Sequence, residues 1–288
     1  MVLDSRLLIA TDELAGQLDN PALRIFDCTV ILEVGPEGLS IRSGREGWAD
    51  AHIPGADFLD LLVELSDQDS ELRFMLPPAK RFAEAMSAHG VEDGMLVVLY
   101  DSRGSSWAAR VWWMLRAYGF DDARVLNGGW TKWTLEGRPT SRAAPSCPRA
   151  RFEARPRPGV FVGKDDVLAG IADGETCLLN GLPGALHRGE VATIPGGRAG
   201  HIPTSRSMPA EELVDPRTHA YLPEPELRAR LEGVGALTAS SVITYCGGGI
   251  AASGVAFALT LIGKDDVAVY DASLEEWATD PDLPIEVG

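Results

Sequence analysis

Residues 241–254 read Ser241-Val242-Ile243-Thr244-Tyr245-Cys246-Gly247-Gly248-Gly249-Ile250-Ala251-Ala252-Ser253-Gly254. Residues 242–245 are apolar and β-branched, which predicts a buried strand. Residues 250–262 are small and apolar without a charge, which predicts a buried helix. In open α/β sheets, ligand sites lie at the carboxyl ends of strands. We therefore expect Cys246 at such an end and at a helix amino terminus, where unpaired backbone N–H groups favour anions, including a thiolate.

This turn is part of an internal repeat in the sequence. His52-Ile53-Pro54 matches His201-Ile202-Pro203, and Tyr100-Asp101 matches Tyr245-Cys246. Further matches follow once one residue is deleted: Gly119 with Gly263, Asp121-Asp122 with Asp265-Asp266, and Trp133 with Trp277. The repeat predicts two copies of one α/β unit, each on the order of 140 residues. Only the second copy has a nucleophile at the turn, because Asp101 stands where Cys246 stands.

The two copies are separated by a proline-rich segment. Strands are predicted at 23–26, 95–100 and 125–126 and again at 176–179, 242–245 and 267–270, with helices at 77–89, 107–118, 164–171, 224–231 and 250–262. Residues 35–47 are rich in glycine and charge, which predicts a loop. We expect an α/β protein of two tandem domains, each a mainly parallel sheet flanked by helices. The boundaries are 1–139 for a non-catalytic domain, 140–158 for a linker, and 159–288 for a catalytic domain.

The composition excludes several kinds of partner. The 288 residues carry a formal net charge of −16, which argues against nucleic acid and anionic membranes. A small anionic substrate stays open, because the local field of a pocket can oppose the net charge. The first four residues lack a basic start and an apolar core, so we expect no signal peptide, and no apolar run is long enough to span a membrane. The four cysteines show no metal-ligand spacing, which favours free thiols in a reducing cytoplasm.

Other interpretations of Cys246 are weaker. A buried cysteine is often a small hydrophobe, and this explanation suits Cys28 and Cys177 better than a cysteine at a helix start. Cys147 lies among linker prolines. The pattern Gly247-x-Gly249-x-x-Ala252 with a later Asp271 partly matches a dinucleotide-binding turn, but the equivalent turn at Asp101 lacks the glycines. A cysteine phosphatase would need arginine at position 252 to hold phosphate. A cysteine hydrolase would need a histidine base such as His52, His187 or His201, and no spacing supports one.

Taken together, these residues resemble the tandem rhodanese-domain sulfurtransferases. The resemblance covers nearly the whole chain. It rests on the doubled His-Ile-Pro element, the turns at Asp101 and Cys246, and three further motifs: Arg110-Val111-Trp112-Trp113, Asn127-Gly128-Gly129-Trp130, and Tyr270-Asp271-Ala272-Ser273 before Trp277. It implies an inactive first domain and a catalytic second domain in which Cys246 carries sulfane sulfur as a persulfide. No metal or organic cofactor is implied.

The resemblance also implies a substrate site. The persulfide would lie in a bowl of backbone N–H groups formed by Gly247, Gly248, Gly249, Ile250, Ala251 and Ala252. Family members that use thiosulfate carry arginine and lysine after the cysteine, whereas those that use 3-mercaptopyruvate have a neutral loop. This chain is closer to the neutral type, although Gly248 replaces the serine of that type. Arg188 matches the family's arginine before a glycine, and Arg198 is the candidate second cation for a carboxylate donor.

Several positions depart from the family. Asn180 stands where aspartate is usual, and Leu182 stands where arginine is usual. Without a serine at position 248, the Ser-His-Asp arrangement proposed for the neutral type is doubtful here. His52 and His201 are candidates for the site, and each has an alternative role in which its imidazole only bonds the backbone of a turn. The pair Trp112-Trp113 is expected in the core and the domain interface.

We therefore expect a cytoplasmic sulfurtransferase. Its donor would be a small molecule, with 3-mercaptopyruvate favoured over thiosulfate, and its acceptor a thiol, thioredoxin or cyanide. A non-enzymatic protein that carries the persulfide for a partner is the alternative.

Overall fold

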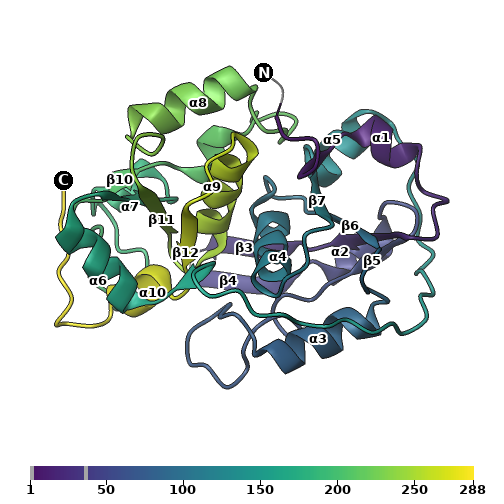
Figure 1. The fold of residues 1–288 in the computed structure, drawn as a ribbon, viewed down its shortest axis with the longest axis horizontal. Helices are drawn as coiled ribbons and strands as arrows, with labels where there is room; N and C mark the ends of the chain where they lie inside the picture. Colours follow the sequence, from purple (N-terminus) through teal and green to yellow (C-terminus); the bar gives the residue numbers. More distant parts are fainter. Residues whose placement is uncertain (1–2, 36–37) are drawn as a thin grey trace.

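Two α/β domains of the same design lie side by side in the computed structural model, which describes residues 3–35 and 38–288 (Figure 1). Each contains a five-stranded sheet in which all neighbouring strands are parallel. The first sheet has the order β1 (Leu8–Ile9), β7 (Ala123–Leu126), β6 (Leu96–Tyr100), β2 (Leu23–Asp27) and β5 (Ala56–Phe58). The second has the order β8 (Phe161–Val162), β12 (Val267–Tyr270), β11 (Ser241–Tyr245), β9 (Thr176–Asn180) and β10 (Arg206–Ser207). The predicted duplication and fold class are confirmed.

Helices connect the strands in corresponding places. In the first domain they are α1 (Thr11–Ala15), α2 (Arg45–Asp50), α3 (Ala79–Ala88), α4 (Ser106–Ala117) and α5 (Gly129–Leu135). In the second they are α6 (Lys164–Asp173), α7 (Gly184–His187), the 3₁₀ helix η1 (Ala210–Leu213), α8 (Glu224–Gly233), α9 (Ile250–Leu261) and α10 (Ser273–Trp277). No helix in the described ranges is long and apolar enough to cross a membrane.

The predicted loop at residues 35–47 is wrong in most of its length. β3 (Val30–Gly35) and β4 (Gly38–Ser43) form an antiparallel hairpin outside the main sheet, and α2 begins at Arg45. Pro36 and Glu37 lie outside the described residues, and so do Met1 and Val2, two of the four residues on which the expectation about a signal peptide rests. The glycine and charge content of this stretch predicts a loop. A hairpin outside the main sheet needs no continuous apolar run, so its strands lack the sequence pattern of a buried strand.

The two domains meet through α4 and α9, which Figure 1 shows in the middle of the molecule. Gly254 of α9 allows this approach, because a Cβ atom there would lie 2.8 Å from the hydroxyl of Ser106 on α4. Trp112 packs edge-on against Phe257, with ring centroids 5.0 Å apart, and Trp113 donates a hydrogen bond to the carbonyl of Ser253 at 3.2 Å. The predicted place of the Trp112-Trp113 pair, in the core and the interface, is confirmed.

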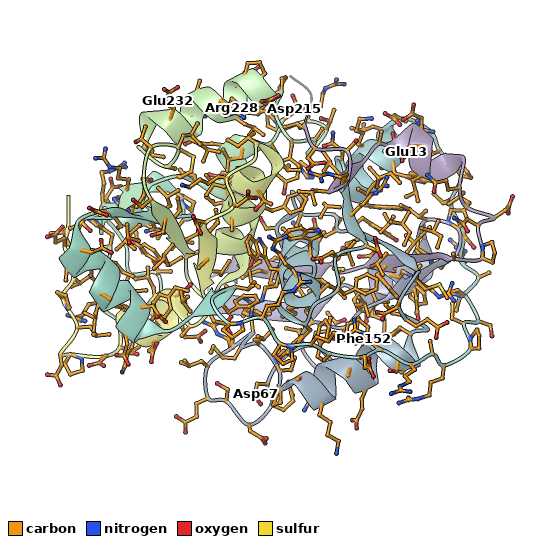
Figure 2. The ribbon with its side chains drawn as sticks, in the orientation of Figure 1. Glu13, Asp67, Phe152, Asp215, Arg228 and Glu232 are labelled. Atoms are coloured by element: carbon orange, nitrogen blue, oxygen red, sulfur yellow. The ribbon has the colours of Figure 1, made fainter. Side chains whose placement is uncertain are left out.

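The segment from residue 140 to 158 runs along the first domain. The backbone of Ser141 pairs with that of His52, and the N–H of Arg155 donates to the carbonyl of Tyr118. Phe152 is buried and packs edge-on against Phe82 of α3; Figure 2 labels it beside that helix. The segment thus has no core of its own but adds a side chain to the core of the first domain.

Candidate active site around Cys246

Cys246 directly follows the central strand of the second sheet. β11 pairs with β9 on one side and β12 on the other, so its carboxyl end lies in the middle of the sheet edge. The turn of residues 246–249 ends at Gly249, whose φ of 78° lies in the left-handed region that favours glycine, and α9 starts at Ile250. The predicted strand, turn and helix are confirmed. Cys246 is 2% exposed.

Ser273 fixes the conformation of this turn. Its hydroxyl oxygen accepts hydrogen bonds from the N–H groups of Cys246 at 3.1 Å and Gly249 at 3.2 Å, and it donates to the carbonyl of Tyr270 at 2.8 Å. The next two residues add backbone bonds, from Leu274 to the carbonyl of Cys246 and from Glu275 to that of Gly247. Our sequence interpretation did not assign Ser273 to the site. Its position after β12, the strand beside β11, was the signal that could have identified it.

Several backbone donors of the turn have no acceptor. Among the described residues, no hydrogen bond is recorded for the N–H groups of Gly247 and Gly248. The N–H groups of Ile250, Ala251 and Ala252 occupy the first turn of α9, where helix geometry supplies no partner. Together with the partial positive charge of the helix start, these donors can stabilise an anion at Cys246.

The equivalent turn of the first domain is folded around an acidic side chain. The buried carboxylate of Asp101 accepts hydrogen bonds from the N–H groups of Arg103, Ser105 and Ala108, at 2.7, 3.0 and 2.9 Å. Burial raises the pKa of Asp101, while these same N–H bonds act to lower it. The first domain therefore fills its own anion-binding turn and has no thiol there.

Each glycine of the Cys246 turn faces a different neighbour. A Cβ atom placed on Gly247 would meet only the Thr193 methyl group, at 3.4 Å. One placed on Gly248 would lie 3.3 Å from Oε2 of Glu275 and 3.4 Å from the ring of Phe74. The third, on Gly249, would lie 2.9 Å from the carbonyl oxygen of Asp271 and 3.0 Å from Nη1 of Arg110. Phe74 and Arg110 belong to the first domain, so both domains surround the turn.

Arg110 provides a buried positive charge beneath the turn. Its side chain is fully buried, and Nη2 donates to Oδ1 of Asp271 at 2.6 Å and to the carbonyl of Phe74. The guanidinium lies over the ring of Phe161, 4.6 Å from its centroid. Nε and Nη1 have no hydrogen-bond partner among the described residues. The ion pair with Asp271 joins the two domains next to Gly249.

The two predicted arginines differ in their surroundings. Arg188 follows α7, has a half-exposed side chain, and pairs with Glu190 at 2.7 Å. Its Nη1 lies 3.0 Å from the Cβ position of Gly184. Arg198 is held at the end of α10, where its guanidinium donates to the carbonyls of Trp277 and Asp280. Neither side chain has a recorded contact with Cys246, and a role of either in donor binding stays a prediction.

The two predicted histidines make matching contacts in their domains. Nδ1 of His52 lies 2.7 Å from the carbonyl of Trp48, and Nδ1 of His201 lies 2.7 Å from the carbonyl of His187. The other ring nitrogen of His52 lies 3.2 Å from the carbonyl of Ala143. These bonds fit the alternative in which the imidazole holds a turn. Burial and the nearby cationic groups lower the pKa of His187 to about 4, so this residue is neutral at pH 7.

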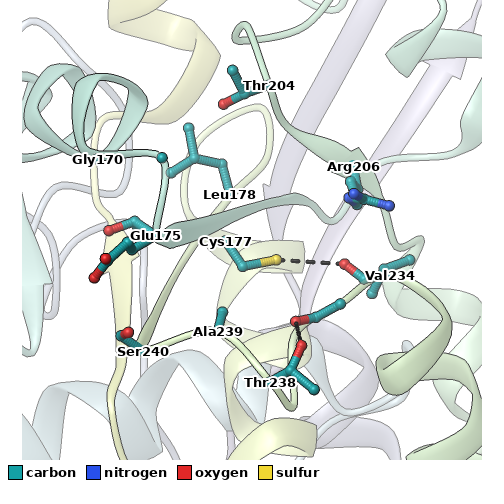
Figure 3. A pocket seen from close by; sticks show the side chains of 13 residues that line it. Gly170, Glu175, Cys177, Leu178, Thr204, Arg206, Val234, Thr238, Ala239 and Ser240 are labelled. Carbon is teal, nitrogen blue, oxygen red and sulfur yellow. Dashed lines mark hydrogen bonds between the residues drawn. The ribbon is translucent and has the colours of Figure 1, made fainter.

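Two cavities differ in their relation to the turn. One, of about 560 Å³, lies between the domains and is lined by Ala251 of α9, Gly181, and the first-domain residues Arg103 and Ser106. It reaches Ala251 in the first turn of α9, five residues after Cys246. The other, of about 550 Å³, contains Cys177, whose thiol lies 3.6 Å from the carbonyl of Val234 (Figure 3). That cavity lies at the amino ends of β9 and β11, whereas Cys246 lies at the carboxyl end of β11.

The chain is similar to known proteins along most of its length. A family model for rhodanese-like domains matches residues 10–136 and 197–280. The chain is 33% identical over 279 residues to the 3-mercaptopyruvate sulfurtransferase of Escherichia coli K12, which covers 96% of this chain and 97% of that protein. It is 35% identical to thiosulfate/3-mercaptopyruvate sulfurtransferase 2 of Arabidopsis thaliana, covering 96% and 86%. The crystal structure of the 3-mercaptopyruvate sulfotransferase SseA from Escherichia coli superposes with a TM-score of 0.82 at 31% identity and covers 92% of this chain and 98% of that one.

Proposed function

The chain belongs to the rhodanese-like sulfurtransferases, and on this premise we propose that it transfers sulfane sulfur from 3-mercaptopyruvate to an acceptor through a persulfide on Cys246. One observation carries the proposal. Cys246 lies at a turn whose N–H groups of Gly247 and Gly248 have no acceptor among the described residues, next to the start of α9. In the first domain the matching turn is filled by the carboxylate of Asp101.

In the first half-reaction, the Cys246 thiolate attacks the sulfur atom of 3-mercaptopyruvate. A sulfur–sulfur bond forms while the carbon–sulfur bond of the donor breaks, and its electron pair leaves on the pyruvate enolate. The proton of the donor thiol ends on the enolate carbon, so the products are pyruvate and a persulfide anion. The free N–H groups of the turn, with the start of α9, would stabilise that anion.

In the second half-reaction, an acceptor removes the outer sulfur atom. A thiol, including a thiol of thioredoxin, would attack the outer sulfur and leave as a persulfide, and Cys246 would return as a thiolate. Cyanide would leave as thiocyanate in the same way. We place this reaction in the cytoplasm, and the four free cysteines are consistent with a reducing compartment.

The donor preference follows from the neutral turn. Thiosulfate is a dianion and would need cations beside Cys246, whereas Gly247, Gly248 and Gly249 offer only backbone donors. A donor with a single carboxylate, such as 3-mercaptopyruvate, needs fewer cations. We propose Arg188 as its partner, with Arg198 as the second cation, and the exposure of Arg188 leaves its guanidinium accessible. His52 and His201 have no part in this proposal beyond holding their turns.

Steady-state kinetics with the two donors and cyanide as acceptor test this function. We expect a higher kcat/KM for 3-mercaptopyruvate than for thiosulfate, and loss of transfer from both donors in Cys246→Ser. Cys177→Ser is the matched control, because the thiol of Cys177 faces the cavity at the amino ends of the strands, away from Cys246. Mass spectrometry should find one added sulfur atom in the donor-treated wild type and in Cys177→Ser. Transfer by Cys246→Ser would contradict the mechanism, and a preference for thiosulfate would contradict the donor assignment.

A further inference from the structure

A segment of the non-catalytic domain covers the Cys246 turn. The segment comprises residues 67–76 and precedes α3; Figure 2 labels Asp67, at its start, on the lower edge of the molecule. The N–H of Leu76 donates to Oδ2 of Asp271 at 2.8 Å. Phe74 lies beside Gly248, packs edge-on against Trp107, and its carbonyl accepts a hydrogen bond from Arg110.

The backbone of this segment is held in an unfavourable conformation. Phe74 has a φ of 61°, in the left-handed region that bulky residues rarely adopt. Such a conformation persists only where surrounding contacts hold it, and it is concentrated at functional sites. Here the surrounding contacts come from Arg110 and from the second domain. The segment is therefore a defined wall of the site.

Glu275 brings a carboxylate to the same place. It belongs to α10, its side chain is 13% exposed, and its Oε2 lies 3.3 Å from the Cβ position of Gly248. Arg73 of the segment pairs with it: Nε donates to Oε1 at 2.5 Å, and the backbone N–H donates to Oε2 at 3.3 Å. A carboxylate thus lies where a side chain at position 248 would point, and a cation from the other domain balances it.

We propose that the Arg73–Glu275 ion pair sets the charge of the donor site and makes the enzyme select against dianionic donors. The inference rests on the proposed function, because it names the residues that decide between the two donor classes at that site. Glu275 repels an incoming anion, and it repels a dianion such as thiosulfate more than a monoanion such as 3-mercaptopyruvate. Arg73 limits this repulsion by holding and neutralising the carboxylate. Donor selection is then shared between the domains.

Opposite changes are expected from the two partners. Glu275→Gln removes the negative charge and frees Arg73, so the ratio of kcat/KM for thiosulfate to that for 3-mercaptopyruvate should rise about three- to tenfold at low ionic strength. Arg73→Gln leaves the carboxylate unbalanced, so the same ratio should fall by a similar factor. Both shifts should shrink in about 0.5 M NaCl, because salt screens charges near the surface. If the ion pair had a purely structural role, both variants would lower kcat/KM for both donors together. The ratio between the donors would then not shift in opposite directions in the two variants.

Glu276→Gln is the matched control. Glu276 is the next residue of α10, and its carboxylate accepts a hydrogen bond from Tyr270 at 2.6 Å rather than facing the turn. Glutamine can accept the same bond, so the donor ratio should not change. An unchanged ratio in Glu275→Gln, or a ratio that shifts in the same direction in Arg73→Gln, would overturn the proposal.

A second measurement separates this proposal from the proposed function. Iodoacetate and iodoacetamide alkylate thiols and differ in one negative charge, and their use requires no sulfur transfer. The rate ratio of iodoacetate to iodoacetamide at Cys246, followed by mass spectrometry, should rise about two- to fivefold in Glu275→Gln and fall in Arg73→Gln. Should the wild type transfer sulfur from neither donor, the function would be wrong while this ratio still decides the role of the ion pair. An alkylation ratio equal in all variants would overturn that role.

Discussion

The carboxylate of Asp101 lies at the same place in the first domain as the thiol of Cys246 in the second. Each residue follows the central strand of its sheet, and each carbonyl accepts a backbone hydrogen bond at 3.0 Å, from Trp130 for Asp101 and from Leu274 for Cys246. The carboxyl group of Asp101 fills its turn by accepting hydrogen bonds from three N–H groups. The equivalent turn in the second domain has free donors and therefore can bind an anion that comes and goes during catalysis.

Replacing Asp101 with alanine should destabilise the protein without removing its chemistry. The substitution leaves the N–H groups of Ser105 and Ala108 buried without an acceptor and removes the bond to Arg103, which costs about 2–4 kcal/mol. Urea unfolding should show this loss, while Cys246 of the folded protein still transfers sulfur. Asp122→Ala, at an exposed position of the same domain, is the control and should change the free energy of unfolding by less than about 0.5 kcal/mol.

Two glycines of the same turn should respond differently to alanine. Gly249→Ala places a Cβ atom 2.9 Å from the carbonyl of Asp271 on a backbone with a φ of 78°, so the turn has to shift. We expect kcat/KM to fall at least about tenfold, because small displacements of reacting groups are costly. Gly247→Ala meets only Thr193 at 3.4 Å and should keep most activity. Equal activities of the two variants would show that the shape of the turn is unimportant.

Ser273 should be needed for activity through its hydroxyl. Ser273→Ala removes the acceptor of the N–H groups of Cys246 and Gly249, and the turn loses two bonds worth about 1 kcal/mol each. We expect kcat to fall about tenfold with a smaller change in KM. Because Ser273 has a φ of 53°, Ser273→Gly relieves backbone strain and also lacks the hydroxyl. Activity restored by glycine would show that strain, and not the hydroxyl, limits the alanine variant.

Much of the fold could be predicted from local sequence. The β-branched run before Cys246, the three glycines after it and the uncharged helix define strand, turn and helix within one window, and the repeat supplies the second copy. Two matched tryptophans of the repeat make corresponding contacts in the structure. Trp133 and Trp277 each donate from the indole to a backbone carbonyl near the end of their domain, Pro139 in one case and Pro284 in the other.

The surroundings of the turn could not be predicted in this way. Arg110 and Asp271 are 161 positions apart, and Arg73 and Glu275 are 202 apart. Such pairs form only after two domains have packed, and no periodicity or local motif relates their positions. Arg110 and Asp271 were part of the motifs that carried the family resemblance, yet their contact with each other depends on how α4 packs against α9.

A third long-range cluster concerns stability instead of catalysis. His89 follows α3, and its ring nitrogens lie 2.7 Å from Oδ2 of Asp57 and 3.3 Å from Oε2 of Glu64. Burial alone would lower the pKa of His89, but the hydrogen bonds to Asp57 and Glu64 outweigh it and raise the pKa to about 9. The pKa values of both carboxyl groups are lowered despite their burial, because of the bonds to His89. The imidazolium also lies at the carboxyl end of a helix, where cations are favoured.

The stability of the protein should therefore fall as the pH rises from about 6.5 to about 9. A histidine whose folded-state pKa lies above its unfolded value of 6.5 stabilises the fold fully below pH 6.5, and this contribution is lost as the pH passes the folded-state pKa. Asp57 and Glu64 stay ionised throughout this window, so the change belongs to His89, and it amounts to about 2–3 kcal/mol. Urea unfolding at pH 6, 7.5 and 9 should show the decline in the wild type and a flatter profile in His89→Asn. His219→Asn is the control, because the ring of His219 bonds the hydroxyl of Thr131 and pairs with no carboxylate among the described residues, so the slope should stay unchanged. A slope in His89→Asn equal to that of the wild type would place the proton uptake on another group.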